Sequence, residues 1–286
     1  MRALVTGAEG QLGRELLSRL GRELAWAGGR SALDVTDAAA VAALVERVRP
    51  DVIFNATAYN RVDAAEAERE LAFAVNAIAP RTLARAAASA GARLVHVSTD
   101  YVFDGARTRP YREDDEAHPL SVYGASKLAG EGHVLASRPE HLVVRTSAVL
   151  GSRGSAQKGG SFVARILDRA RAGEPLRVVA DQVFAPTLAS DLAEALVALA
   201  RTPASGLLHV TNEGSCSWHE LASAAVRAAG LDAPVAAITA AELKLAARRP
   251  AYSVLDTSRY RSLGLTRPRR WQDGLANLVG AASGPA

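Results

Sequence analysis

The feature that most constrains this chain is a glycine-rich turn that follows directly on a short apolar run. Residues 3–6 read Ala-Leu-Val-Thr and lead into Gly7-Ala8-Glu9-Gly10-Gln11-Leu12-Gly13. Leucines then recur at helical spacing over residues 12–20. A buried strand is typically a short apolar run, and an amphipathic helix repeats its apolar residues every three or four positions. The sequence therefore predicts a strand, a tight glycine turn and a helix, in that order.

Glycines spaced three residues apart suit a dinucleotide site. The first permits the tight turn, the second lets a pyrophosphate approach the backbone, and the third allows close packing of helix on strand. The helix N-terminus adds free N–H groups and a positive dipole end. An ordinary strand–helix turn is the alternative, but the position at the head of the chain favours a nucleotide. We therefore predict cofactor contacts at the turn residues Gly7, Gly10, Gln11, Leu12 and Gly13.

Strand and helix patterns alternate through the first half of the chain. This alternation predicts an α/β fold of the Rossmann type, in which a doubly wound parallel sheet is covered by helices on both faces. The predicted strands are residues 3–6, 23–29, 51–57, 93–99 and 141–147. The predicted helices are residues 11–24, 37–49, 63–90 with a break near Pro80, and 121–137.

The rhythm changes after about residue 148. Residues 151–160 are rich in Gly and Ser, which predicts a loop. Helices at 161–172, 187–200 and 217–229, strands at 176–180 and 207–211, and short pieces in the last 50 residues follow. We expect a dinucleotide-binding domain with the catalytic residues over 1–150, and a smaller C-terminal substrate-binding lobe over 151–286. Some segments of that lobe are expected to rejoin the main sheet.

Composition and charge exclude several classes of protein. The formal charge is +4, but basic and acidic residues are interspersed, so no nucleic-acid partner is predicted. No apolar run is long enough to cross a bilayer. The single cysteine, Cys216, fits a reducing compartment. The six histidines lack metal-ligand spacing. We expect a soluble cytoplasmic protein with no membrane or metal partner, either a monomer or a homodimer.

The end of the second predicted strand bears on the choice of cofactor. An acid often holds the ribose 2′-hydroxyl of NAD there, but here the strand ends in Gly28-Gly29-Arg30. A cation can accept the 2′-phosphate of NADP, so the sequence favours NADPH, with NADH possible. A solvent-facing Arg30 is the alternative. Asp34 is expected to cap the next helix or to contact the adenine ring.

Tyr123 and Lys127 form a Tyr-x-x-x-Lys pair on a predicted helix. Spacing of four residues puts both side chains on one face, one turn apart. A phenol normally loses its proton near pH 10, and a neighbouring ammonium favours the phenolate. The pair is therefore expected to lower the pKa of Tyr123 into the range of proton transfer. A surface pair without function is the alternative, because the motif occurs by chance in many helices.

A second polar segment, Ser98-Thr99-Asp100-Tyr101, follows the strand predicted at 93–99. Ligands of a parallel sheet gather at the carboxyl ends of its strands. The hydroxyl of Thr99 can hold a carbonyl oxygen there, and with Tyr123 and Lys127 it completes an oxyanion-stabilising set. We therefore predict these three as the catalytic residues of a carbonyl reductase. A strand-end turn residue is the alternative for Thr99.

These segments resemble the extended short-chain dehydrogenase/reductase superfamily and, more closely, the dTDP-4-dehydrorhamnose reductase family. The most specific matches are Ser98-Thr99-Asp100-Tyr101-Val102-Phe103 and Tyr123-Gly124-Ala125-Ser126-Lys127-Leu128-Ala129-Gly130-Glu131. Weaker matches extend over the whole chain: Leu33-Asp34-Val35-Thr36-Asp37, Val62-Asp63-Ala64-Ala65-Glu66, Arg145-Thr146-Ser147, Asp181-Gln182, Pro186-Thr187, Arg249-Pro250 and Ser253.

The resemblance implies roles for individual residues. Tyr123 would donate the proton, and Lys127 would bind the nicotinamide ribose and lower the pKa of the tyrosine. Thr99 and Asp100 would touch a dTDP-linked deoxyhexose whose 4-keto carbon receives the hydride. The remaining cofactor contacts would be Gly10, Gln11 and Leu12 at the pyrophosphate, Asp34 and Val35 at the adenine, and Ala58, Tyr59 and Asn60 along the cofactor.

The chain departs from the family pattern where the family contacts cofactor or sugar. Ala148 stands where a tryptophan usually packs on the sugar, Val183-Phe184 replaces a Tyr-Gly pair, and Asn60 replaces a threonine. These changes leave the predicted chemistry intact and bear on the identity of the sugar. Some relatives bind magnesium through acids at a dimer contact. Here Glu15 is present but Ser190 replaces one acid, so no metal is predicted.

Other functions compatible with this fold remain open at this point. A reductase or epimerase acting on another nucleotide sugar fits the same residues. A dehydratase would usually carry an Asp-Glu pair after the catalytic threonine, whereas here Asp100 is followed by Tyr101. A non-catalytic regulatory subunit resembling that of methionine adenosyltransferase shares the fold. The presence of Thr99, Tyr123 and Lys127 together favours an enzyme, a distinction that fold alone does not make.

Overall fold

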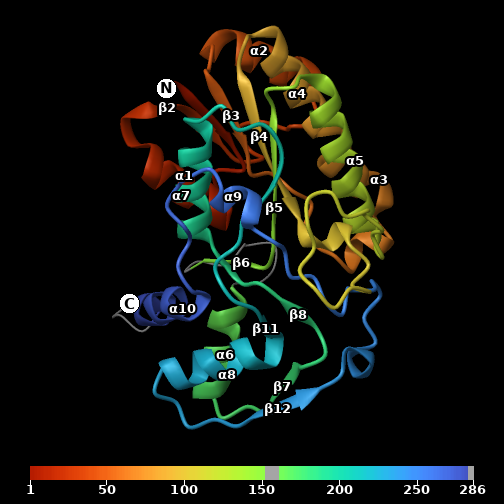
Figure 1. The fold of residues 1–286 in the computed structure, drawn as a ribbon, viewed down its shortest axis with the longest axis vertical. Helices are drawn as coiled ribbons and strands as arrows, with labels where there is room; N and C mark the ends of the chain where they lie inside the picture. Colours follow the sequence, from red (N-terminus) through yellow and green to blue (C-terminus); the bar gives the residue numbers. More distant parts are fainter. Residues whose placement is uncertain (152–160, 283–286) are drawn as a thin grey trace.

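A six-stranded parallel sheet forms the larger part of the computed structural model, which describes residues 1–151 and 161–282 (Figure 1). Its strand order is β10-β5-β4-β3-β1-β2. The order places β1 between β3 and β2, so the chain winds outwards in both directions from its start. The strands are β1 (Ala3–Thr6), β2 (Leu24–Gly28), β3 (Val52–Asn55), β4 (Arg93–Thr99), β5 (Leu142–Thr146) and β10 (Gly206–His209). The predicted α/β fold of the Rossmann type is confirmed.

Helices cover both faces of this sheet. On one face, α1 (Gln11–Leu20) and α7 (Ala189–Ala200) pack on the alternate strand residues Ala3, Val5 and Phe54. On the other face, α2 (Ala38–Val48), α4 (Ala79–Ser89) and α5 (Val122–Ser137) enclose Leu4, Ile53 and Leu94. Burial on both faces explains why these strands read as continuous apolar runs.

A smaller group of elements lies beyond the carboxyl ends of the strands (Figure 1). Helices α6 (Phe162–Arg171), α8 (Trp218–Ala228) and α10 (Trp271–Ala282) share an apolar cluster built around Leu167, Leu221 and Leu275. Paired short strands flank the helices: β6 (Val149–Leu150) with β9 (Thr187–Leu188), β7 (Leu176–Val179) with β12 (Val235–Ile238), and β8 (Val183–Phe184) with β11 (Cys216–Ser217). Helix α9 (Ser258–Arg261) contacts β10 in the main sheet.

Several predicted boundaries differ from the observed ones. Helix α1 ends at Leu20 because Gly21 takes a positive φ of 50°. The long helical region contains α3 (Arg69–Phe73), a π-helical turn at Ala74–Ile78 and then α4, so the break precedes Pro80, which lies in the first turn of α4. The last 50 residues include α10, a 12-residue helix, and not short pieces alone. The loop predicted at 151–160 falls outside the described residues, apart from Gly151.

A buried ion pair joins the sheet to α5. Arg145 of β5 and Glu131 of α5 approach to 2.7 Å, and their side chains are 5% and 3% exposed. Glu131 also accepts a hydrogen bond of 2.5 Å from the Ser98 hydroxyl of β4. The Arg145 guanidinium lies over the ring of Phe103, 5.0 Å from its centroid. Separating Glu131 from Arg145 would leave an uncompensated charge in the interior, which is strongly unfavourable. The pair therefore holds α5 in place against β4 and β5.

We expect Glu131→Gln to lower the free energy of unfolding by about 3–5 kcal/mol, since it leaves the Arg145 charge buried and unpaired. Urea denaturation followed by circular dichroism measures the change. The matched control is Glu68→Gln, which breaks the exposed Arg61–Glu68 pair and should change stability by about 1 kcal/mol or less. Equal effects of the two substitutions would contradict this assignment.

Candidate active site

The glycine turn after β1 has the geometry that the sequence predicts. Gly7 has a φ of 75°, and a Cβ there would lie 2.7 Å from the backbone carbon of Ala56. A Cβ on Gly13 would collide with the backbone of Gly7 and Ala8. A Cβ on Gly10 would meet only the Gly7 oxygen, at 3.2 Å. Gly7 and Gly13 are therefore required for packing, whereas Gly10 leaves space beside the N-terminus of α1.

Unpartnered polar atoms collect at the same edge of the sheet. They are buried side-chain atoms without a hydrogen-bond partner, and their residues follow β1 and β3 or end β5: Gln11 Oε1, Thr57 Oγ1, Asn60 Oδ1 and Thr146 Oγ1. Buried polar groups are rarely left unpaired in native proteins. Together with the glycine turn and the free N–H groups of α1, these atoms fit a bound dinucleotide.

At the end of β2 the structure adds an acid that the sequence argument missed. A Cβ on Gly29 would overlap the carboxylate of Glu9, so this exposed acid lies directly against the strand end. The Ser31 hydroxyl is 3.5 Å from Glu9 Oε1. Arg30 is exposed beside it. A carboxylate and a guanidinium therefore flank the position expected for the adenosine ribose. Glu9 belongs to the glycine turn that the sequence analysis identified. Its position beside Gly29 is visible only in the folded chain.

Asp34 does not cap the next helix, and this part of the prediction is wrong. Its carboxylate accepts hydrogen bonds from the backbone N–H and the hydroxyl of Thr36, which lower its pKa. The N-cap of α2 is Asp37, which accepts from the N–H groups of Ala39 and Ala40. Asp34 thus closes a local turn and stays exposed. The neighbouring Val35 packs its side chain into the core and can offer a ligand only its backbone.

Residues 58–60, predicted to line the cofactor, lie in the segment after β3. Tyr59 is buried and is fixed by both of its backbone groups: its N–H donates to Asn76 Oδ1 and its carbonyl accepts from Asn76 Nδ2. Asn76 lies in the π-helical turn. The amide of Asn76 also donates to Ser126 on α5, at 3.0 Å. One buried amide therefore ties the segment after β3 to the helix that carries Tyr123.

Thr99 and Tyr123 come together at the carboxyl end of β4. Thr99 is the last residue of the strand, and its hydroxyl accepts from the Tyr101 N–H and donates to Asp100 Oδ1. Tyr123 lies in the first turn of α5, where the neighbouring Thr99 hydroxyl acts to lower its pKa. The Tyr101 ring packs edge-on to the Tyr123 ring, with centroids 6.0 Å apart. The structure therefore brings together the hydroxyl and phenol that the sequence proposed as partners.

The pKa of Tyr123 in this structure is set by burial and by nearby groups, and its lowering by Lys127 in the cofactor-bound enzyme stays a prediction. Burial raises the pKa of the phenol to about 12, and Asp100 acts in the same direction, against the effect of the Thr99 hydroxyl. The Lys127 amine donates to the Val97 carbonyl at 2.6 Å. The phenol is therefore protonated at neutral pH, which is the form that a proton donor requires.

Asp100 is enclosed by hydroxyl groups. Ser253 and Ser147 donate to its Oδ2 at 2.6 and 2.8 Å. Burial raises the pKa of its carboxyl to about 6, against these hydrogen bonds, which lower it. Ser147 follows β5, and Ser253 belongs to the C-terminal part of the chain. Asp100 therefore joins three segments at the site, and a sugar contact with it would compete with this hydrogen bonding.

A second link to the C-terminal part involves Arg249. Its guanidinium pairs with Asp63 at 2.6 Å and lowers the pKa of that carboxyl. Arg249 also interacts with the hydroxyl of Tyr101, whose pKa is raised chiefly by burial. Both Asp63 and Arg249 lie in segments that the family resemblance singled out without a role. Their pairing holds the C-terminal segment beside the strand end that carries Thr99.

Ala148 has an unusual backbone. Its φ is 38°, a conformation that residues other than glycine seldom adopt. Its side chain packs on the apolar cluster that contains Leu150 and Phe184. Phe184 in turn packs on Trp218, with ring centroids 4.2 Å apart. Phe184 of β8 and Trp218 of α8 therefore lie in the apolar cluster on which Ala148 packs. The family resemblance places a tryptophan at position 148 itself.

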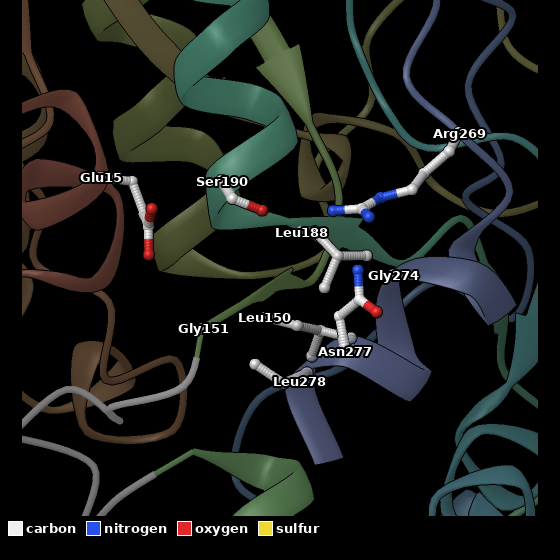
Figure 2. A pocket seen from close by; sticks show the side chains of 9 residues that line it. All are labelled: Glu15, Leu150, Gly151, Leu188, Ser190, Arg269, Gly274, Asn277 and Leu278. Carbon is white, nitrogen blue, oxygen red and sulfur yellow. The ribbon is translucent and has the colours of Figure 1, made fainter. Parts of the chain in front are cut away.

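A separate pocket of about 150 Å³ lies between α1, α7 and α10 (Figure 2). Its described lining includes Glu15, Ser190 and Arg269, and contains neither the glycine turn nor Tyr123. Arg269 pairs with Asp191 at 2.8 Å. The pocket thus contains the acid Glu15 and the guanidinium of Arg269. Ser190 lies at the position where the family resemblance implies a second acid.

The match to known proteins extends over the whole chain. The family model described as the RmlD substrate binding domain matches residues 1–283. A dTDP-4-dehydrorhamnose reductase from Streptomyces griseus is 44% identical over 294 residues, covering 100% of this chain and 95% of the relative. The chain belongs to the RmlD substrate binding domain family. It is a reductase-like enzyme of the NAD(P)-dependent, dTDP-sugar type, as the sequence predicted.

Further relatives agree on the fold and on the class of reaction. A probable dTDP-4,6-dihydroxy-2-methyloxan-3-one 4-ketoreductase from Streptomyces antibioticus is 42% identical, covering 96% of this chain and 93% of the relative. A crystal structure of dTDP-4-dehydrorhamnose reductase from Bacillus anthracis in complex with NADP has a TM-score of 0.92 at 37% identity, covering 97% of this chain and 98% of that one. Reduction of a 4-keto group on a dTDP-deoxysugar is the activity common to these names. In the described part of the chain, no helix has the length and apolar character needed to cross a membrane.

We expect Gly10→Ala to weaken NADPH binding by tenfold or more, about 1.4 kcal/mol, because the added methyl group occupies the space beside the helix N-terminus. Titration of the bound nicotinamide fluorescence measures the affinity. The control is Gly132→Ala on the exposed side of α5, where a Cβ meets no atom within 4 Å. Unchanged affinity in a folded Gly10→Ala protein would remove this turn from the cofactor site.

Proposed function

We propose that this enzyme reduces the 4-keto group of dTDP-4-dehydrorhamnose to give dTDP-L-rhamnose. The observation that carries the proposal is the placement of Thr99 at the end of β4 beside Tyr123 in the first turn of α5, at the sheet edge that also holds the glycine turn. A protonated phenol and a hydroxyl at one strand end can bind a carbonyl oxygen together. The full-length similarity to a dTDP-4-dehydrorhamnose reductase supports this substrate.

The proposed chemistry follows from the protonation state of the phenol. NAD(P)H supplies the hydride that adds to the C4 keto carbon. Thr99 holds the keto oxygen by donating its hydroxyl hydrogen, which it gives to Asp100 in this structure. Tyr123 donates its proton to the same oxygen as negative charge develops there. The C4 carbonyl thus becomes an alcohol, and the phenol becomes a phenolate that solvent protonates.

The remaining roles form part of the same proposal. Lys127 binds the nicotinamide ribose, and Asp100 and Ala148 line the sugar side together with Thr99. Residues 1–150 act as the cofactor domain and residues 151–286 as the substrate lobe, with β10 returning to the main sheet. The proposed cofactor contacts are Gly7, Gly10, Gln11, Leu12, Gly13, Arg30, Asp34, Val35, Ala58, Tyr59, Asn60, Tyr123 and Lys127.

Another keto sugar is the alternative substrate, and one observation favours it. Ala148, with its left-handed backbone and small side chain, replaces the tryptophan expected against the sugar ring. A relative from Streptomyces antibioticus that is 42% identical to this chain carries the name of a probable 4-ketoreductase of a different ring, which supports this alternative. A 4-keto sugar with another substitution pattern would use the same Thr99 and Tyr123.

We expect the purified protein to oxidise NADPH when dTDP-4-dehydrorhamnose is added, and Tyr123→Phe to lower kcat by about 10²- to 10⁴-fold because the proton donor is lost. Loss of absorbance at the nicotinamide band measures the rate. The control is Tyr252→Phe, which removes a half-buried phenol that packs on the apolar cluster of Phe103 and Tyr111. Full activity of Tyr123→Phe would exclude the mechanism. Turnover of only another dTDP-4-keto sugar would keep the mechanism and reassign the substrate.

The two charges at the end of β2 set the preference between NADPH and NADH. We expect Arg30→Gln to lower the ratio of kcat/KM for NADPH over NADH, and Glu9→Gln to raise it. The 2′-phosphate of NADPH is attracted by the Arg30 guanidinium and repelled by the Glu9 carboxylate. Because both side chains are exposed, each change should be about three- to fivefold, equivalent to about 1 kcal/mol or less. An unchanged ratio in both variants would place the adenosine ribose elsewhere.

A further inference from the structure

A buried row of polar side chains crosses the sheet beneath the reacting residues. Thr6, Asn55 and His96 occupy paired positions on β1, β3 and β4. The Thr6 hydroxyl donates to Asn55 Oδ1 at 2.9 Å, and Asn55 Nδ2 lies 3.0 Å from His96 Nδ1. His96 Nε2 then faces Lys127 Nζ at 3.5 Å. The row connects the glycine-turn strand to the lysine, and the proposed mechanism leaves most of it without a role.

The direction of hydrogen bonding along this row is fixed at one end. The backbone N–H of Thr57 donates to Asn55 Oδ1 at 3.1 Å. A flipped amide would set the NH₂ group of Asn55 against that backbone N–H. The oxygen therefore faces Thr57, and the NH₂ group donates to His96 Nδ1. A neutral imidazole accepts at one nitrogen and donates at the other, so the hydrogen of His96 is on Nε2.

His96 is neutral in this environment. It is fully buried, and burial together with the neighbouring Lys127 lowers its pKa well below the ordinary value. Its Nε2–H therefore points towards Lys127 Nζ. An ammonium carries only hydrogens and cannot accept, whereas a neutral amine has one lone pair. The neutral amine can accept from His96 while it donates to the Val97 carbonyl.

We propose that His96, with its tautomer set by Asn55, is a positioning residue that presents an N–H donor to Lys127 and thereby favours the neutral form of this amine. The other charged group facing the lysine is Glu131, one turn along α5, which favours the ammonium and is itself paired with Arg145. Burial is the main cause that lowers the pKa of Lys127, to about 8.

The consequence for catalysis rests on the proposed function. Any step that needs the Lys127 ammonium should decline as pH rises through about 8. An ordinary lysine would keep its charge to about pH 10. His96 therefore acts on the reaction through Lys127.

The chain offers a direct measurement because it contains three lysines, at positions 127, 158 and 244. Protein labelled with ¹³C at lysine Cε gives few signals, and Lys127→Arg identifies the one from Lys127. We expect this signal to titrate near pH 8 in the wild type. In His96→Gln the midpoint should rise by about one unit, because a side-chain amide can turn its oxygen towards the ammonium.

The matched control is His141→Gln, which replaces another fully buried histidine. His141 accepts from the Leu94 N–H and does not contact Lys127. The midpoint of Lys127 should stay unchanged in this variant. A midpoint that does not rise in His96→Gln, or that rises equally in His141→Gln, would overturn the proposal.

A second measurement needs no substitution in the row. The ¹⁵N shifts of the two His96 ring nitrogens in the wild type report which one carries hydrogen, and we expect hydrogen on Nε2. Hydrogen on Nδ1 would overturn the proposal even if His96→Gln fails to fold. With turnover established, the alkaline limb of kcat should follow the Lys127 midpoint in both proteins, and a fixed limb would remove the catalytic consequence. Absence of turnover would count against the proposed function and leave both magnetic resonance measurements valid.

Discussion

The in-register parallel alignment of β1, β3, β4 and β5 is the constraint on which the site depends. Residue-by-residue pairing places Thr6, Asn55 and His96 side by side, and then Ser98 beside Arg145. Side chains alternate between the faces of a strand, so a slip of one residue would move each of these groups to the opposite face. Burial of the apolar residues of each strand fixes the register. The polar residues at the ends of the strands are therefore aligned as well.

Helix α5 positions the proposed site residues relative to this sheet. Its first turn carries Tyr123, its second carries Lys127, and its third carries Glu131. Glu131 meets Ser98 and Arg145 within the sheet, so the helix is held at a definite rotation about its axis. The same rotation directs Lys127 to the Val97 carbonyl and to His96. A structural ion pair and the phenol proposed as proton donor therefore share one rigid element, which is how pre-organisation of a site is commonly obtained.

Local pattern was sufficient to predict most of the fold and the meeting of Thr99 and Tyr123 at one edge of the sheet. The glycine turn, the apolar strands and the helical spacing all report on neighbours within a few positions, and these predictions were confirmed at the level of elements. The Thr99–Tyr123 pair was predictable because one residue ends a strand and the other begins a helix at the same sheet edge. The family and the relatives found by comparison agree with the predicted enzyme class, an NAD(P)-dependent reductase of dTDP-sugars.

Contacts between distant segments were not predictable in the same way. Nothing local to Ser253 indicates that its hydroxyl binds Asp100, and Glu9 reaches the end of β2 only through the turn that precedes it. Helical spacing gives the face on which a side chain lies but not its partner, so the surroundings of Tyr123 and Lys127 were not predictable from it. Lys127 found a carbonyl on β4, and burial then determined the state of the phenol.

The hydroxyl of Ser253 and the guanidinium of Arg249 have a bearing on how the enzyme matures. The glycine turn, Tyr123 and Lys127 all lie within the first 127 positions, so a nascent chain can begin to fold around them early. Asp63 and Asp100 have partners, Arg249 and Ser253, that are synthesised much later. The hydrogen bonds around Asp100 are thus completed only after residue 253 has left the ribosome.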